Sequence, residues 1–178
     1  MQVRLLGPVD VIVGGGSRPV RGVRRGAVLA VLALHCGEVV STGRLVDIVW
    51  GETAPPTAVN TLQAHVSYLR RVLGKTTAIR TRPPGYVLDL GAESTDVQPA
   101  ERLLRRGTRS AEGARLLETA LALWRGRSLA DLTGVPWLEE QAQRLELLGV
   151  GVKLALSAAR LACGEHLALV PSCPMSPW

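Results

Sequence analysis

The sequence contains no phenylalanine, only three cysteines and no long uninterrupted hydrophobic stretch. A membrane-spanning helix needs roughly 20 consecutive apolar residues, and charged residues interrupt every apolar run of this chain before that length. Cys36, Cys163 and Cys173 share no CxxC spacing. The sequence therefore predicts no membrane span, no disulfide framework and no zinc site.

Acidic residues are absent from one long segment. No Asp or Glu occurs between Glu52 and Asp89, whereas five basic residues lie there, namely Arg70, Arg71, Lys75, Arg80 and Arg82. Residues 1–91 carry eleven Arg and Lys against five acids, a net charge of +6, while residues 92–178 are neutral. Charge of one sign attracts polyanions. The first half of the chain is therefore expected to bind a phosphate backbone or an acidic lipid.

Residue patterns typical of catalysis are also missing. There is no Ser/His/Asp or Cys/His set and no HExxH, and the adjacent Glu139 and Glu140 face different ways on a helix. Residues 14–16 are three glycines, but they lack a Lys-Ser/Thr pair and no helix follows them directly, so they predict a hairpin turn rather than a phosphate loop. We expect no enzyme activity, cofactor or metal. Met1 leads straight into a strand-like pattern without a signal sequence, which predicts a cytoplasmic protein.

The first half of the chain predicts a sheet, three helices and a hairpin in that order. Alternating segments around Gly7-Pro8 indicate a small antiparallel sheet, and Ser41 or Thr42 is expected to cap the second helix. The helices are expected at 24–37, 41–51 and 57–74, and the hairpin at 78–90. This order is the plan of a winged helix-turn-helix, in which the third helix enters the DNA major groove and the hairpin reaches a phosphate or the minor groove.

The third predicted helix has two unlike faces. Leu62, Val66, Leu69 and Leu73 form one apolar stripe at helical spacing. The remaining faces carry small or hydrogen-bonding groups and no carboxylate. Asn and Gln can bond adenine, Arg can bond guanine, and Ala and Thr methyl groups can pack on thymine. The candidate DNA-binding residues of this helix are Asn60, Thr61, Gln63, Ala64, Ser67, Tyr68, Arg70 and Arg71, the two arginines being expected at phosphates.

Four further arginines are candidates for DNA contact. Arg80 and Arg82 flank the predicted hairpin tip, from which side chains can reach backbone phosphate. Arg24 and Arg25 open the first helix, where they oppose the helix dipole; they either lie near an anion or are solvated on the surface. Tyr86 is expected to pack across the hairpin.

The second half of the chain is predicted to be helical. An acidic, turn-rich segment at 91–100 precedes three stretches with 3–4 spacing, at 100–107, 114–126 and 136–164. Short loops between them predict antiparallel helix pairs, as in a tetratricopeptide-like array. We therefore predict a mostly helical α+β fold with a winged helix-turn-helix domain at 1–91 and a helical domain at 95–178.

These motifs resemble a known family. VRLLGPVDV, RRGAVLAVLALHCGEVVSTGRLVDIVWG, PPTAVNTLQAHVSYLRRVLG and IRTRPPGYVLDL look like the OmpR-type winged helix of the Streptomyces antibiotic regulatory protein family. LLETALALWRGRSLADLTGVPWLEEQAQRLEL resembles the family's second module, the bacterial transcriptional activation domain. The resemblance covers about residues 2–170.

The resemblance implies a cytoplasmic, nucleoid-associated activator of antibiotic biosynthesis genes. Such proteins bind direct repeats of double-stranded DNA near the promoter −35 region as head-to-tail dimers and recruit RNA polymerase. Residues from Asn60 to Arg71 and around Arg82 would contact DNA. The loop GETAPPT, with Gly51, Glu52, Thr53, Pro55 and Pro56, would face polymerase.

Two departures from the family pattern leave alternatives open. The wing reads PPGY, with Pro84 in place of a glycine, so one backbone N–H is lost at the turn. By the family pattern, about half of the activation domain is expected to be present, as in a fragment or a natural truncation, and no receiver domain is expected before the winged helix. The chain could therefore bind DNA without activating, or its helical half could be a protein-interaction module.

Overall fold

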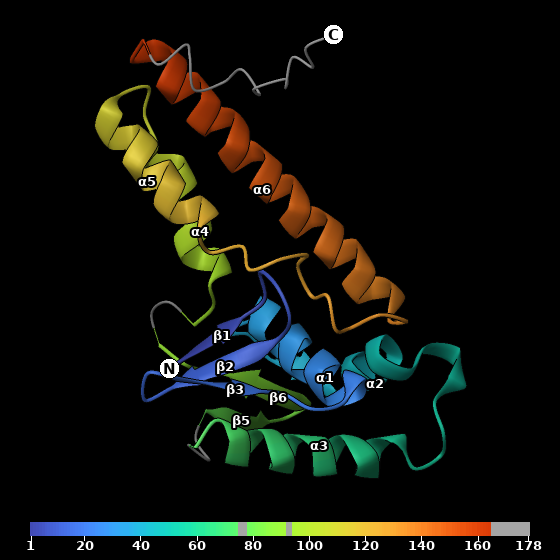
Figure 1. Cartoon of the computed structure of the whole chain (residues 1–178). Helices are drawn as coiled ribbons and strands as arrows, with labels where there is room; N and C mark the ends of the chain where they lie inside the picture. The colour runs from blue at the N-terminus through green and yellow to red at the C-terminus, as the bar shows by residue number, and fades with distance from the viewer. Residues whose placement is uncertain (75–77, 92–93, 165–178) are drawn as a thin grey trace, which may run out of the picture.

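Two three-stranded sheets and three helices form the first half of the chain, and three further helices extend away from it (Figure 1). The computed structural model describes residues 1–74, 78–91 and 94–164. Lys75, Cys173 and the proline-rich end of the predicted helical domain lie outside these ranges. The fold is mixed α+β and mostly helical, as the sequence predicts.

The first sheet packs the start of the chain into the core. It contains β1 (Gln2–Arg4), β2 (Asp10–Val13) and β3 (Gly16–Pro19) in that order, all antiparallel. Gly14 and Gly15 connect β2 to β3 with φ of 59° and 82°, values that favour glycine and suit a two-residue hairpin turn. The hairpin prediction for the three glycines is confirmed, whereas β3 itself was not predicted.

Three helices follow: α1 (Val23–Leu34), α2 (Thr42–Trp50) and α3 (Ala58–Val72). α1 is buried from Gly26 to Ala33 and forms the centre of the core. It ends three residues before the predicted Gly37 because His35 already has non-helical dihedrals. The predicted cap of α2 is confirmed, since Ser41 Oγ accepts a 3.1 Å hydrogen bond from Arg44 N.

The wing is the hairpin of β5 (Ile79–Arg82) and β6 (Gly85–Leu88), extended by β4 (Val40–Ser41) on the other side of β6. The hairpin forms although Pro84 has no N–H, and the Pro84 carbonyl accepts a 3.1 Å bond from Thr42 N at the start of α2. A side chain at position 85 would place its Cβ 1.9 Å from the Val40 carbonyl oxygen. Only glycine at this position lets β6 approach β4 so closely.

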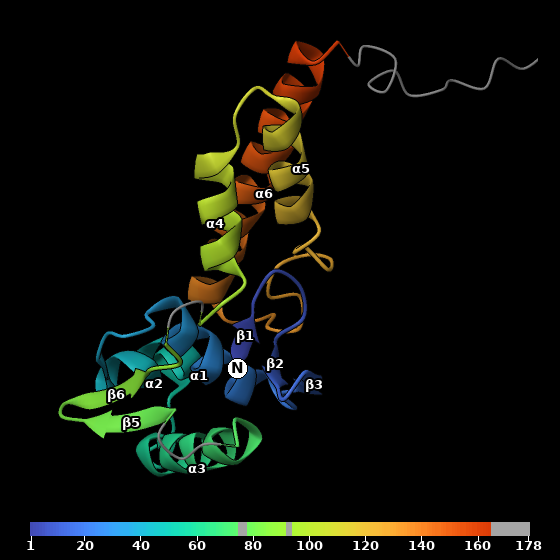
Figure 2. The same ribbon diagram turned by 90° about the vertical axis from the view of Figure 1, so that its left-hand side faces the viewer.

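The second half contains α4 (Val97–Arg106), α5 (Ala111–Leu121) and α6 (Pro136–Ala162), which lie side by side in both views (Figure 1, Figure 2). Ser110 caps α5 by accepting a 3.1 Å bond from Gly113 N. The three predicted helical stretches are thus confirmed. In the part of the chain that the structure describes, no helix has the length and apolar character that crossing a bilayer requires.

The segment between the two halves is bound to the first strand. Val3 N donates to the Ser94 carbonyl at 2.9 Å, and Val3 pairs with Thr95 in a parallel bridge. The Asp96 carboxylate accepts bonds from Leu5 N at 2.7 Å and Leu6 N at 3.1 Å. The hydrophobic core also continues across this junction, since Leu129, Leu132, Leu138 and Leu145 belong to the same buried cluster as β1 and α1.

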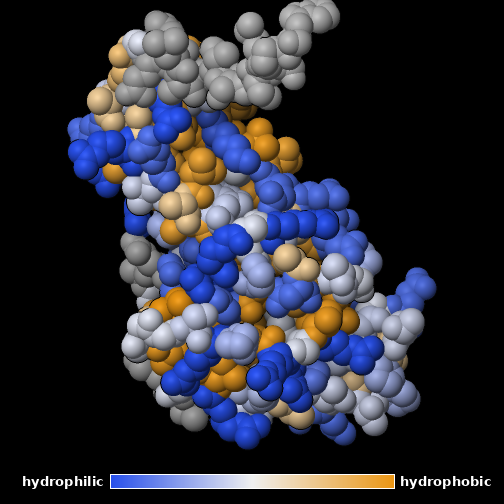
Figure 3. Space-filling model, in the orientation of Figure 1, coloured by the Kyte–Doolittle hydropathy of each residue, from blue (hydrophilic) through white to orange (hydrophobic). Residues whose placement is uncertain are grey.

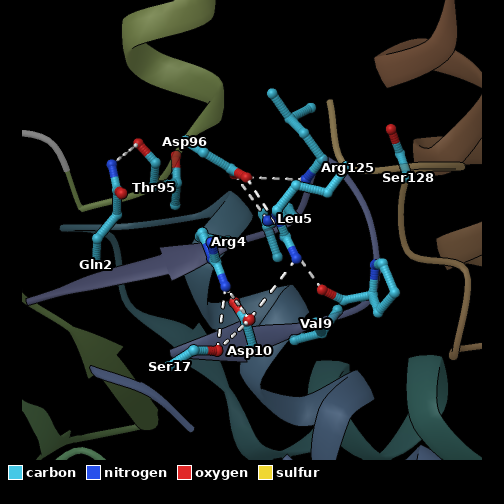
Figure 4. Close-up of polar contacts among 12 residues, drawn as sticks. Gln2, Arg4, Leu5, Val9, Asp10, Ser17, Thr95, Asp96, Arg125 and Ser128 are labelled. Atoms are coloured by element: carbon cyan, nitrogen blue, oxygen red, sulfur yellow. Dashed lines mark hydrogen bonds and ion pairs between the residues drawn. The ribbon is translucent and has the colours of Figure 1, made fainter. Parts of the chain in front are cut away.

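Arg125, which follows α5, joins two carboxylates at this junction (Figure 4). Its guanidinium lies 3.8 Å from Asp96 and 3.6 Å from Asp10, and it donates to the Pro8 carbonyl at 3.2 Å. Burial raises the pKa of the Asp96 carboxyl, although the amides of Leu5 and Leu6 and the charge of Arg125 act in the opposite direction.

Asp10 behaves differently from Asp96. Burial alone would raise the pKa of its carboxyl, but hydrogen bonds from Arg4 and Ser17 and the charge of Arg125 outweigh burial and lower that pKa. Arg4 forms an ion pair with Asp10, and this hydrogen bond raises the pKa of Arg4. Asp10 is therefore held as the ionised partner of two arginines.

The lowered pKa of Asp10 predicts a pH-dependent contribution to stability. A carboxyl whose pKa is lower in the folded state stabilises the fold above its usual value of 3.8, and this stabilisation is lost as pH falls through the folded pKa. Asp10→Asn is expected to reduce the free energy of unfolding by about 1–2 kcal/mol near neutral pH. The deficit should shrink in urea unfolding series run below about pH 4. An equal deficit at every pH would contradict this assignment.

Candidate nucleic-acid interface

α3 lies at the opposite end of the molecule from the distal ends of α4, α5 and α6, and one side of it faces solvent (Figure 1, Figure 2). Its predicted apolar stripe is buried: Leu62, Leu69 and Leu73 are 0% exposed and Val66 is 1% exposed. Arg70 and Arg71 lie in the last turn of α3, where the helix dipole favours positively charged side chains. The stripe anchors α3 to α1 and α2 and leaves the other face free.

The outer face of α3 presents the predicted recognition residues. Asn60, Gln63, Ala64, Ser67 and Arg71 are exposed, and Thr61, Tyr68 and Arg70 are half-buried. The hydroxyl of Ser67 donates to the Gln63 carbonyl at 2.9 Å, and that of Thr61 to the Thr57 carbonyl at 3.0 Å. The side-chain amides of Asn60 and Gln63, in contrast, have no partner among the described residues. Those two amides are the groups best placed to bond base edges.

Arg70 has partners within the protein. Its Nε donates to the Ile79 carbonyl at 2.9 Å, and its Nη2 donates to Thr81 Oγ1 at 3.0 Å. Both acceptors belong to β5, the first strand of the wing. The sequence predicts that Arg70 meets phosphate, whereas in the structure this guanidinium connects α3 to the wing.

The two predicted wing arginines are not equivalent. Arg82 is the last residue before the turn, pairs in register with Gly85, and is exposed without an ion-pair partner in the described ranges. Arg80 lies two residues further from the tip and forms an ion pair with Asp89, both side chains being about half exposed. Tyr86 is 7% exposed and belongs to the main hydrophobic core cluster, so its ring is buried. Arg82 is therefore the wing residue most available to a phosphate.

Arg24 and Arg25 lie over aromatic rings of the neighbouring helices. The Arg25 guanidinium is 4.3 Å from the ring centroid of Tyr68 on α3, and that of Arg24 is 5.7 Å from the Trp50 ring on α2. Trp50 in turn stacks on His65 at 6.0 Å. Burial lowers the pKa of His65, and the positive charges of Arg25 and Arg24 act in the same direction. The first turn of α1 thus adds positive charge beside α3.

One basic residue near α3 was missed by the sequence reasoning. Arg18, on β3, donates to the carbonyl of Val72 at the end of α3 at 3.3 Å. This contact pairs residues 54 positions apart, so no local pattern could have indicated it. Arg18 adds a further exposed cation at the C-terminal end of α3.

The predicted polymerase-facing loop lies between α2 and α3. It begins with the short 3-10 helix η1 (Gly51–Thr53), in which Thr53 Oγ1 donates to the Trp50 carbonyl at 2.8 Å. Gly51, Glu52, Thr53, Pro55 and Pro56 are all exposed. Figure 1 shows this loop projecting to the side of the molecule, beyond one end of α3. Within the described residues, no group of His, Cys, Asp or Glu could hold a metal ion.

Comparison with known proteins agrees with this geometry. Residues 22–88 match the family described as "Transcriptional regulatory protein, C terminal", and residues 88–174 match "Bacterial transcriptional activator domain". The chain is 33% identical over 187 residues to the regulatory protein DnrI of Streptomyces peucetius, covering 96% of this chain and 69% of DnrI. It is 33% identical over 146 residues to the transcriptional regulator RedD of Streptomyces coelicolor, covering 74% of this chain and 41% of RedD.

A solved structure shares the fold. The structure of Mycobacterium tuberculosis EmbR, in complex with a low affinity phosphopeptide, superposes with a TM-score of 0.86 at 28% identity. The superposition covers 94% of this chain and 47% of that chain. The present chain thus spans less than half the length of EmbR and RedD and about two thirds of DnrI. With an OmpR-type winged helix followed by a bacterial transcriptional activator domain, the chain belongs to the Streptomyces antibiotic regulatory protein family of DNA-binding transcriptional regulators.

Proposed function

We propose that the chain is a transcriptional activator of secondary-metabolite biosynthesis genes, which reads DNA with α3 and contacts the adjacent phosphates with the wing. One observation carries this proposal: the exposed face of α3 holds the unbonded amides of Asn60 and Gln63, the exposed Arg71 and no carboxylate. Arg82 extends the positive charge onto the wing. An interface of this kind combines base readout with phosphate contact.

The manner of activation follows the family resemblance. We propose that two copies bind head to tail on direct repeats near the promoter −35 region, and that Gly51 to Pro56 contact RNA polymerase. The exposure of this loop to one side of α3 supports the proposal, because DNA on α3 would leave the loop accessible. Activity is expected in the cytoplasm, at the nucleoid, without a cofactor.

Base-reading and phosphate-contacting residues are expected to respond differently to mutation. Asn60→Ala should change the preferred bases within the site, with a cost of about 1–3 kcal/mol on the preferred sequence. Arg82→Ala should weaken all sequences alike and reduce the slope of log affinity against log salt by about 0.9. Mobility shifts with the wild-type site and with single-base variants, over a range of salt concentrations, measure both effects.

The proposal itself is tested on the intergenic DNA next to the chain's own gene. We expect retardation at low salt, steep weakening as salt rises, and a footprint over a direct repeat. If that DNA is not retarded at low salt, the proposed function is wrong.

A second candidate function is protein binding by the helical half. Four large apolar side chains on α6 are exposed, Leu147 (69%), Val150 (48%), Leu154 (67%) and Leu161 (47%). Figure 3 shows hydrophobic surface over this helical part of the molecule. Contiguous apolar surface marks interaction sites. Retention of a protein partner by the chain, together with no DNA binding, would favour this alternative.

A further inference from the structure

α6 is apolar on two sides. One side is buried within the protein and includes Leu145, Gly149, Val152 and Leu156. The other side carries a seam of exposed side chains, which are Leu147, Val150, Leu154 and Leu161. These four recur at intervals of three, four and seven residues, which is the a and d spacing of a heptad. A helix with such a seam is suited to packing lengthwise against a second helix.

No other described element carries a matching seam. The remaining exposed large apolar side chains of the described residues lie singly on other elements, at Met1, Val23, Val39 and Val59. Exposed apolar residues that lie singly are ordinary on a protein surface, whereas a row of them marks a contact. The helix that best complements the α6 seam is therefore α6 of another copy.

Two hollows lie along this seam, and their lining has the pattern of coiled-coil holes. In a coiled coil, each side chain of the seam enters a hole formed by four residues of the facing helix. A hollow of about 340 Å³ is lined by residues 143, 146, 147 and 150 of α6, together with Ala142 and Arg127. A second hollow, of about 380 Å³, is lined by residues 146, 149, 150 and 153 of α6 beside Trp124. Both sets follow the i, i+3, i+4, i+7 spacing of neighbours on one helix face.

The charges beside the seam favour antiparallel pairing. Glu146 and Lys153 are seven residues apart and so lie on the same flank of the seam. Glu146 Oε1 accepts a 2.8 Å hydrogen bond from Ser128 N, and Lys153 is exposed without an ion-pair partner in the described ranges. A two-fold axis near Gly149 would place Glu146 of each copy opposite Lys153 of the other. In a parallel pair, this flank would face the uncharged Gly151 instead.

We propose that a second copy of this chain packs antiparallel on the exposed face of α6, in an isologous dimer. Leu147 and Val150 of each copy enter the two hollows of the other, and Glu146 of each copy pairs with Lys153 of the other. This inference deepens the second candidate function by naming the protein partner of the helical half. It does not depend on DNA binding.

This contact is distinct from the head-to-tail arrangement proposed on DNA. Each winged-helix domain adjoins the start of its own α6, where Pro136 and Trp137 lie close to α2 (Figure 1). Antiparallel α6 helices therefore place the two winged-helix domains at opposite ends of the dimer. A contact made by so few apolar side chains is small, so the dimer should form and dissociate with protein concentration.

Sedimentation equilibrium of the full chain without DNA tests the proposal. Over about 1–200 μM, the wild type is expected to pass from monomer to dimer with a dissociation constant between about 10 and 100 μM. Val150→Lys should weaken association at least tenfold, because it puts a charge in the centre of the contact. Val39→Lys is the matched control, since Val39 is 45% exposed and Val150 is 48% exposed. This control should change the dissociation constant less than about twofold.

Reversal of the flanking charges tests the antiparallel orientation. Glu146→Lys and Lys153→Glu should each weaken self-association about fivefold, because each brings like charges together across the contact. An equimolar mixture of the two variants should recover the wild-type affinity as a heterodimer, since opposite charges then face each other at both positions. Thermal unfolding of each variant checks that the fold is retained.

Three results would overturn the proposal. The wild type could stay monomeric up to about 200 μM, as it would if residues 165–178 or another protein covered the α6 face. Val39→Lys could weaken association as much as Val150→Lys, or the mixture of charge variants could fail to associate better than either variant alone. Because no DNA is present, these results leave the proposed function untouched, and absence of operator binding would leave this dimer untouched.

Discussion

Replacing Asp96 by alanine is expected to lower the free energy of unfolding by about 3 kcal/mol, a large loss for a single residue. Asp96 is 2% exposed and accepts hydrogen bonds from the amides of Leu5 and Leu6. Alanine would leave both buried N–H groups without an acceptor, and Arg125 would lose one of its two carboxylates. Urea unfolding followed by circular dichroism measures the change.

Two further variants show which property of Asp96 matters. Because burial raises the pKa of its carboxyl, the ionised form is penalised and the acceptor oxygens matter more than the charge. Asp96→Asn, which keeps one acceptor oxygen, should therefore lose only about 1–2 kcal/mol. Asp131 is the matched control: its exposed carboxylate accepts a single 2.8 Å bond from Val9 N, and Asp131→Ala should cost about 1 kcal/mol or less. Equal losses for Asp96→Ala and Asp131→Ala would contradict the assignment.

Local sequence patterns predicted the helices of this fold and the buried side of α3. The 3–4 spacing of Leu62, Val66 and Leu69 reports directly which side of a helix is buried, and Ser41 caps α2 through a residue only three positions away. These features depend on neighbours in sequence, so a single sequence contains them.

Contacts between distant residues could not be predicted in the same way. The turn-rich segment at 91–100 suggests a separator, yet Ser94, Thr95 and Asp96 are buried against β1, more than 90 residues away in sequence. β3 was missed because its sequence, GSRP, has no apolar alternation and all four residues are exposed. Arg70 and Arg80 were treated as free cations, since nothing in the sequence shows that the wing supplies their partners.

Arg70 and Arg71 are adjacent in sequence but are expected to weaken DNA binding by different routes. Arg71 is exposed without a partner among the described residues, so Arg71→Ala should remove one phosphate contact and lower the salt slope by about 0.9. Arg70 donates hydrogen bonds to the Ile79 carbonyl and to Thr81, so Arg70→Ala should release the wing from α3. The phosphate contact of Arg82 on the wing would then be lost indirectly. Measured alone, either variant is expected to reduce affinity about tenfold at low salt.

A double-mutant cycle with Arg82 distinguishes the two routes. Arg71→Ala and Arg82→Ala affect independent phosphates, so their effects on binding free energy should add within about 0.5 kcal/mol. Arg70→Ala should weaken binding little further when Arg82 is already alanine, because the phosphate contact that Arg70 supports has then been removed. Mobility shifts with the three single and two double variants give both coupling energies. If the effects of Arg70→Ala and Arg82→Ala were additive, Arg70 would contact phosphate directly when DNA binds, and its bonds to β5 would have to break on binding.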